Sequence, residues 1–173
     1  MLPSFETKRL LLKPRLMSDL NDCLEMDRDA EVTKYISGPW KNHTQHERFV
    51  RNRIETHYGV GLGYWSIFLE SNHSKFVGWI LLIPYDGVGP EIEIGWRLNR
   101  TSWGMGYATE ATLPIVKHAF NTVGVAKFFA DIDIRNNGSM RVAEKIGMQF
   151  TGDSEHAGLP CKSYIMTKDK VRF

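Results

Sequence analysis

The sequence carries its clearest motif at Trp103-Gly104-Met105-Gly106-Tyr107-Ala108-Thr109-Glu110-Ala111. Beyond these glycines, apolar residues recur at spacings of three and four through residues 108–120, which is typical of a helix packed on a sheet. The first amide groups of a helix have no partner within it, and the helix dipole adds partial positive charge there. The motif therefore suits a phosphate group, and a tight glycine turn without a ligand is the plain alternative.

Two common nucleotide-binding motifs do not fit this segment. A Walker loop needs G-x-x-x-x-G-K-S/T, and the sequence contains no such string. The dinucleotide fingerprint G-x-G-x-x-G fails at its third glycine, where Thr109 stands, and the preceding strands are predicted to form a meander instead of a βαβ unit. Both interpretations are excluded.

The flanking sequence predicts a mixed α/β sheet in a single domain, residues 1–173, because no repeat or linker interrupts it. Alternating apolar residues and turn signals predict the strands, and apolar spacings of three and four predict the helices. The predicted strands are residues 5–13, 64–70, 75–83, 91–98, 127–134, 148–152 and 163–167, and the predicted helices are residues 18–26, 29–36, 44–58, 108–120 and 139–146.

Composition favours a soluble, folded, cytoplasmic protein. The chain has 173 residues, of which 42% are hydrophobic and 24% charged, and 22 Lys and Arg against 20 Asp and Glu give a net charge of +2. The basic residues are scattered, which disfavours nucleic acid as a partner. Cys23 and Cys161 lie too far apart for a CxxC zinc motif and suggest no disulfide framework. No apolar run is long enough for a signal peptide or a membrane span.

Three segments resemble the GNAT superfamily of acyl-CoA-dependent N-acetyltransferases. The glycine motif is similar to its pyrophosphate loop, Gln/Arg-x-x-Gly-x-Gly/Ala, at Gly106 and Ala108. Trp103 replaces the first residue of that pattern, as in the ribosomal-protein N-terminal (alanine/serine) acetyltransferase branch. The other two segments are Glu93-Ile94-Gly95-Trp96 and Asn136-Asn137-Gly138-Ser139-Met140-Arg141-Val142-Ala143-Glu144-Lys145-Ile146-Gly147. The resemblance extends over residues 5–167.

This resemblance implies a mostly antiparallel, twisted sheet flanked by helices, in which the fourth and fifth strands (residues 91–98 and 127–134) splay apart. We expect a bulge at Gly95, although a packing role for this glycine is the alternative. The cofactor would be acetyl-CoA, acting as a cosubstrate, and no metal is implied. The implied cofactor-binding residues are Ile94, Gly95, Trp96, Arg97, Leu98, Trp103, Gly104, Met105, Gly106, Tyr107, Ala108, Thr109, Asn136 and Ser139.

The implied reaction is transfer of an acetyl group from acetyl-CoA to a primary amine within a ternary complex. Glu93 is the candidate base, acting through water or with a raised pKa, because an ordinary Glu with a pKa of ~4.3 is a weak base. Strand alternation places Glu91 on the same face, so one of the two carboxylates could be merely solvated. A backbone amide of Ile94 or Gly95 would hold the oxyanion.

The acid that protonates the departing thiolate is implied to be Ser139. Many GNAT enzymes use a Tyr seven residues after the Asn of the third segment, but Ala143 occupies that position here. In the ribosomal-protein branch a Ser three residues after that Asn is thought to serve. A serine at the start of a helix is also a common N-cap, and the two roles are compatible.

The sequence leaves the acceptor open between a protein N-terminus and a small-molecule amine. At pH 7 an α-amine needs only ~1–1.4 kcal/mol to lose its proton, whereas a lysine needs about 4.6 kcal/mol. The implied acceptor walls, residues 27–60 and 152–161, are not dominated by acidic residues, which disfavours a polycation. A CoA-binding sensor or scaffold without activity is the alternative function, and the protein is expected to be a monomer or homodimer.

Several other residues are given structural interpretations. His43 and His46 lack a third ligand in register, so no metal site is expected. His118 is expected to face solvent, because it lies away from the apolar stripe of its helix. Three tryptophans are expected either in the core or on the acceptor side of the cleft: Trp40, Trp65 and Trp96.

Overall fold

The structure is a computed structural model that describes residues 1–171, and it contains one eight-stranded sheet. The strands lie in the order β1-β2-β3-β4-β5-β6-β8-β7, and β5 and β6 are the one parallel pair among them. The predicted mixed, mostly antiparallel sheet is confirmed. The strands are β1 (Phe5–Glu6), β2 (Leu10–Pro14), β3 (Gly63–Leu69), β4 (Asn72–Pro84), β5 (Ile92–Leu98), β6 (Lys127–Asp133), β7 (Gln149–His156) and β8 (Leu159–Thr167).

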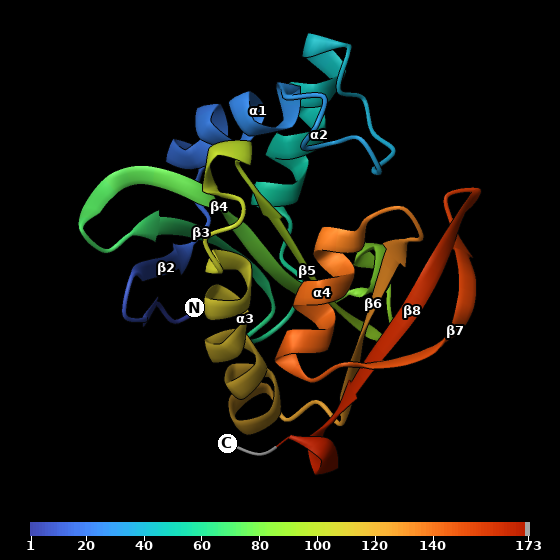
Figure 1. Cartoon of the computed structure of the whole chain (residues 1–173). Coiled ribbons are helices and arrows are strands. Elements are labelled where there is room, and N and C mark those ends of the chain that lie inside the picture. Colours follow the sequence, from blue (N-terminus) through green and yellow to red (C-terminus); the bar gives the residue numbers. More distant parts are fainter. Residues whose placement is uncertain (172–173) are drawn as a thin grey trace.

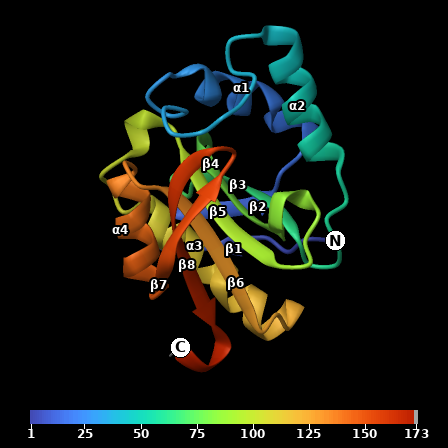
Figure 2. The same ribbon diagram turned by 90° about the vertical axis from the view of Figure 1, so that its right-hand side faces the viewer.

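Four α-helices cover the two faces of this sheet within the described chain (Figures 1 and 2). The first pair, α1 (Leu20–Arg28) and α2 (His43–Glu55), contributes to one buried apolar cluster. The second pair, α3 (Tyr107–His118) and α4 (Asn137–Ile146), contributes to the other. No helix within residues 1–171 is long and apolar enough to cross a membrane.

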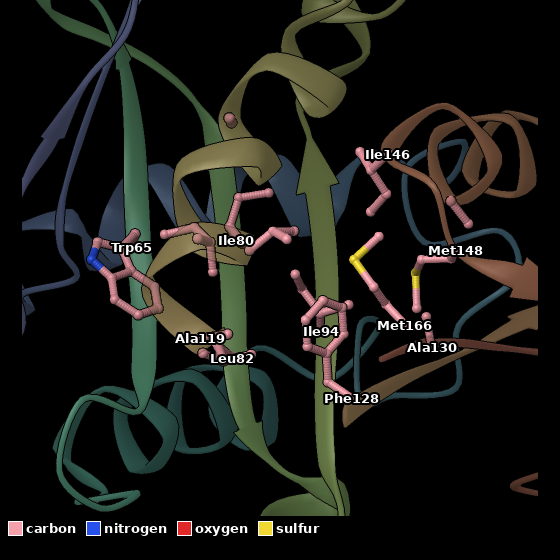
Figure 3. Close-up of a cluster of buried hydrophobic side chains, with 14 of the residues drawn as sticks. Trp65, Ile80, Leu82, Ile94, Ala119, Phe128, Ala130, Ile146, Met148 and Met166 are labelled. Atoms are coloured by element: carbon pink, nitrogen blue, oxygen red, sulfur yellow. The ribbon is translucent and has the colours of Figure 1, made fainter. Parts of the chain in front are cut away.

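Strand β4 shows why both faces need a cover. Ile80 and Leu82 belong to the α3 and α4 core, whereas Leu81 and Ile83 belong to the α1 and α2 core. Successive side chains of a strand point to opposite faces, so this unbroken apolar run is typical of a strand buried on both sides. Figure 3 shows Ile80 and Leu82 close to Ile94 of β5 in the larger core.

Strands β5 and β6 separate after a single residue pair, Glu93 with Phe129. On its other side, β5 pairs with β4 in unbroken register from Ile92 to Leu98, so the bulge expected at Gly95 is absent. Gly95 instead has a packing role: a Cβ atom built on it would lie 3.3 Å from Leu81 Cγ, which is tighter than most such contacts. The predicted splay between these strands is therefore present, and it arises where pairing stops.

The predicted helix over residues 29–36 is wrong. The chain forms isolated turns there, with hydrogen bonds from the amide of Val32 to Asp29 O (2.9 Å) and from the amide of Ile36 to Thr33 O (3.0 Å). A single helical turn fixes several backbone angles for one hydrogen bond. A segment this short therefore gains little free energy from becoming a helix. The last two strands are in turn longer than predicted, and they form a hairpin with a turn at Ala157 and Gly158.

The prediction that His118 faces solvent is also wrong. Its side chain is buried, its Nε2 lies 2.8 Å from Gly61 O, and its ring contacts the rings of Phe5 and Trp65 edge-on. The N-terminal strand and the loop after α2 cover this side of α3. Helix periodicity alone does not show that distant segments will cover a helix face.

Glu110, in the first turn of α3, fastens the N-terminal hairpin of β1 and β2 to the glycine motif. Its carboxylate accepts hydrogen bonds from Thr7 Oγ1 (2.7 Å), the Arg9 amide (2.9 Å) and Arg9 Nε (2.7 Å). Burial opposes ionisation of Glu110, but these hydrogen bonds outweigh it and hold its pKa below the usual value. The negative charge also lies favourably at the helix N-terminus.

We expect Glu110→Gln to lower the free energy of unfolding by about 1–2 kcal/mol at pH 7, because the amide cannot accept these charge-assisted hydrogen bonds. A depressed pKa stabilises the fold above the pKa of the unfolded chain, and that contribution is lost as the pH falls through the folded pKa. The difference in free energy of unfolding between the parent protein and Glu110→Gln should therefore become smaller at acidic pH.

Urea unfolding of both proteins at pH 7 and pH 3 measures this. Glu47→Gln is the control, because Glu47 forms an exposed ion pair with Arg51 on α2 and should change stability by less than about 0.5 kcal/mol. An equal loss for Glu110→Gln at both pH values would contradict the assignment.

Candidate functional site

A large cleft opens on the α3 and α4 side of the sheet, where β5 and β6 have separated. Its volume is about 590 Å³. The end of β5, the glycine loop and the start of α4 form its walls, and residues 31–36 close one side. Most of the predicted cofactor-binding residues line this cleft, namely Trp96, Arg97, Leu98, Trp103, Gly104, Gly106, Tyr107, Ala108, Thr109, Asn136 and Ser139.

Three predicted cofactor residues do not line this cleft. The side chain of Ile94 belongs to the core, Gly95 packs on Leu81, and the side chain of Met105 is exposed. The backbone of residues 94–98 nevertheless runs along the edge of β5 that β6 leaves unpaired. Such an edge offers amide and carbonyl groups to an extended ligand.

The glycine loop has the geometry of an anion site. Gly104 and Gly106 have φ angles of 72° and 77°, in the left-handed region that other residues avoid. Gly106 is the N-cap of α3, so the amides of Tyr107, Ala108 and Thr109 that follow have no acceptor within the helix. The indole of Trp103 donates a hydrogen bond to Leu98 O (3.0 Å), which holds the loop against the end of β5.

Basic side chains around the cleft were missed in the sequence. Lys34, Arg135, Arg141 and Lys145 all contribute to its walls. The guanidinium of Arg135 pairs with Asp133 (2.8 Å) and lies 5.1 Å from the ring centroid of Tyr35. The four-residue spacing of Arg141 and Lys145, on one face of α4, was the available signal. Their positive charge suits a ligand that carries several phosphates.

Ser139 does not cap α4. The N-cap is Asn136, whose side-chain oxygen accepts a hydrogen bond from the Ser139 amide (3.1 Å). Asparagine and serine are equally good caps, and the spacing of the turn places Asn136 at the cap position. The Ser139 hydroxyl, which lines the cleft, has no hydrogen-bond partner within residues 1–171 and is free to contact a ligand.

A smaller pocket of about 170 Å³ lies beside β5 on the α1 and α2 side of the sheet. Glu93 and Arg97 line it because they lie on that face of the strand. Arg97 and Ile36 also line the large cleft, so the two cavities meet at these residues. The other lining residues are Arg15, Cys23, Asp27, Ser37, Trp40, Phe49, Val50, Arg53, Tyr64, Trp79, Leu81, Asp86 and His156.

This pocket raises the pKa of Glu93 to about 7. Burial is the main cause, and the negative charges of Asp86 and Asp131 add to it, while Arg53 opposes the shift. The neighbouring Glu91 is exposed, which separates the two carboxylates that strand alternation left equivalent. Glu93 is thus a carboxyl group that can take up and release a proton near neutral pH.

A buried polar cluster holds Arg97 in place between the two cavities. Asp27 is 3% exposed, and its carboxylate contacts Arg97 Nη1 (2.7 Å) and His46 Nε2 (3.1 Å). The Arg97 guanidinium lies 5.0 Å from the ring centroid of Trp40 and 4.8 Å from that of Trp79. His46 is therefore a partner of Asp27, and no group of three or more potential metal ligands occurs in the described part of the chain.

The three tryptophans singled out in the sequence have different positions. Trp40 lines the smaller pocket, Trp96 lines the large cleft, and Trp65 is fully buried in the core. Trp79 lines the smaller pocket but was not predicted to do so. Its position within a continuous apolar run gave no sign that one side of it borders a cavity.

A second polar cluster lies where β6 leaves β5. The carboxylate of Asp131 accepts hydrogen bonds from the hydroxyls of Tyr85 and Ser163, and Tyr85 Oη lies 3.2 Å from His156 Nδ1. Burial and the hydrogen bond to Asp131 raise the pKa of Tyr85, so the phenol stays protonated. This cluster supplies part of the negative field at Glu93.

Comparison with known proteins decides the family. Residues 9–149 match the acetyltransferase (GNAT) domain family. The chain belongs to the GNAT family. It is 34% identical over 124 residues to an uncharacterised protein, YkkB, of Bacillus subtilis, with 71% of each chain covered. It is also 29% identical over 146 residues to an uncharacterised N-acetyltransferase, YnaD, of the same organism, with 84% of this chain and 82% of the relative covered.

Among solved structures, a GNAT acetyltransferase from Bacillus anthracis is similar, with a TM-score of 0.80 and 25% identity over 96% of this chain and 99% of that one. The chain is therefore a GNAT acetyl-CoA-dependent N-acetyltransferase. Its large cleft fits the donor substrate: the glycine loop suits the pyrophosphate, the basic side chains suit phosphate groups, and the free edge of β5 suits the pantetheine.

The raised pKa of Glu93 predicts a measurable effect on stability. The unfolded chain should have a Glu93 pKa of ~4.3, so between that value and about 7 the folded protein binds more protons. The contribution of Glu93 to the free energy of unfolding therefore falls as the pH rises through that window. Glu93→Gln should raise the free energy of unfolding by roughly 1–3 kcal/mol at pH 8 and leave it unchanged near pH 4.

Urea unfolding at the two pH values measures the difference, with Glu91→Gln, an exposed residue just before β5, as the control. A Glu93→Gln protein that is less stable than the parent at pH 8 would show that the carboxylate is needed for folding.

Proposed function

We propose that the protein acetylates a primary amine by direct attack within a ternary complex, with the amine in the smaller pocket and the acetyl donor in the large cleft. The observation that supports this is the position of β5, which contributes residues to both cavities and carries Glu93 on the amine side. Two cavities that meet at Arg97 and Ile36 allow donor and acceptor to be bound together.

Glu93 is proposed as the base. In its ionised form it accepts a proton from the bound ammonium group, directly or through water, so that the neutral nitrogen can form the new C–N bond. The nitrogen gives its second proton to solvent as the tetrahedral intermediate becomes the amide. A pKa near 7 matches this task, because both protonation states are then populated at neutral pH. A backbone amide of Ile94 or Gly95 stabilises the negative charge that develops on the carbonyl oxygen as the nitrogen attacks.

Ser139 is proposed as the acid. When the C–S bond breaks, its hydroxyl gives a proton to the sulfur and regains one from solvent. Two observations support it: the hydroxyl lines the cleft, and the capping role is taken by Asn136. The core position of Ala143 excludes an acid from the place where many GNAT enzymes carry a tyrosine.

We expect Glu93→Gln to reduce kcat/KM by about 10²–10⁴, the usual contribution of a positioned base. In the parent enzyme kcat/KM should rise with pH through an inflection near 7 that the variant lacks. Glu91→Gln, an exposed carboxylate just before β5 that does not line the pocket, should stay within about threefold of the parent. The assay is thiol release from acetyl-CoA over a panel of amines and peptides. A retained inflection in Glu93→Gln would contradict the assignment.

Ser139→Ala should lower kcat by about 10–100-fold while CoA affinity, measured by calorimetry, changes little. Ser74→Ala, an exposed residue near the start of β4 that lines neither cavity, is the control. An equal loss of CoA affinity would assign Ser139 to binding alone. Tight CoA binding by the parent protein with no turnover on any acceptor would favour the sensor or scaffold over the enzyme.

A further inference from the structure

The smaller pocket contains a buried cation without a counter-ion. Arg15, directly after β2, is only 8% exposed, and its Nε and Nη2 have no hydrogen-bond partner. It forms no ion pair with any residue within 1–171. Its guanidinium stacks on Tyr64 of β3 at 3.6 Å and lies 5.9 Å from Trp79 of β4, so it extends across the sheet toward β5.

The other charged groups of the pocket do not neutralise Arg15. Asp27 is already bound to Arg97 and His46. The Cys23 thiol lies close to Arg15, but burial raises its pKa to about 11, so it carries no charge at neutral pH. Asp86 pairs with His156 (3.7 Å) on the hairpin of β7 and β8.

An unpaired guanidinium is costly to bury, so its presence in a cavity needs an explanation. Stacking on Tyr64 offsets part of this cost but leaves Nε and Nη2 without partners. Those groups are the donors that bind a carboxylate side-on, often through two hydrogen bonds. A second arginine, Arg53, lines the same pocket and adds to the positive potential.

The pocket is therefore charged in two ways. Glu93 and Asp86 suit an ammonium group, whereas Arg15 suits an anion. A polycation would place positive charge against Arg15 and Arg53, which is unfavourable in a partly desolvated cavity. The volume of about 170 Å³ also favours a compact acceptor over a long one.

We propose that the acceptor is a small amine that also carries a carboxylate, such as a free amino acid, and that Arg15 binds the carboxylate while the amine faces Glu93. This inference rests on the proposed function, since it names the acceptor class for the same pocket. Arg15 then acts as a specificity-determining residue, because an acceptor without the anion leaves its buried N–H groups unpaired.

Matched acceptors provide the test. The free amino acids, each beside its own carboxamide, are assayed with acetyl-CoA by thiol release, together with spermidine and short peptide amides. At least one free amino acid should have a kcat/KM about tenfold or more above that of its carboxamide. A carboxamide, spermidine or peptide amide that is acetylated as well as, or better than, every free amino acid would overturn the inference.

Variants then assign the effect to Arg15. Arg15→Met keeps the length and the stacking surface and should lower kcat/KM for the preferred amino acid about tenfold or more, through KM, with little change for its carboxamide. Lys13→Met, an exposed cation two residues away, should change neither. An equal loss for both acceptors, with a lower melting temperature, would show that Arg15 is only a structural residue.

Binding without turnover separates the two hypotheses. Trp40 and Trp79 border the pocket, so free amino acids should change the tryptophan fluorescence of the CoA-bound protein saturably, and Arg15→Met should abolish this. Such binding without thiol release would refute the proposed acetyl transfer and leave the carboxylate site standing. Thiol release on other amines without this binding would refute the carboxylate site alone. Absence of both would overturn both.

Discussion

The structure depends on a single residue pair between β5 and β6. These parallel strands share only Glu93 and Phe129, and beyond that pair the sheet divides. The unpaired edge of β5 cannot be left against an apolar core, because its amide and carbonyl groups need partners. It is instead exposed to a cleft bordered by the helix starts at Gly106 and Asn136. The cleft proposed to bind the acetyl donor is thus a consequence of incomplete strand pairing.

Strand β5 also separates the two halves of the site. Its period of two places Trp96 and Leu98 toward the large cleft and Glu93 toward the smaller pocket, so one strand contributes residues to both cavities. Arg97 lies on the boundary and is held by Asp27 from α1, with His46 from α2 behind it. The ion pairs of Asp27 therefore connect helices α1 and α2 to β5, the strand that carries the candidate base.

Local signals in the sequence located much of the large cleft but not its basic side chains. The glycine loop and the start of α4 are each contiguous in the sequence, and the structure brings them together at the large cleft, whereas Glu93 lines the smaller pocket. The acceptor side was out of reach, because Arg15 and Asp27 reach their neighbours from segments far away in the chain. Nothing near Arg15 in the sequence distinguishes it from a surface arginine. It is distinguished only by its burial beside the rings of Tyr64 and Trp79 on other strands.

Glu110 connects the N-terminal hairpin to the helix turn that follows the glycine loop. It belongs to the first turn of α3, whose preceding amides face the large cleft, and it holds Arg9 and Thr7 from the opposite side. If a ligand at these amides favours the docked hairpin, the docked hairpin favours the ligand by the same free energy. The N-terminal hairpin is therefore linked through Glu110 to the first turn of α3, although none of the first ten residues lines the cleft.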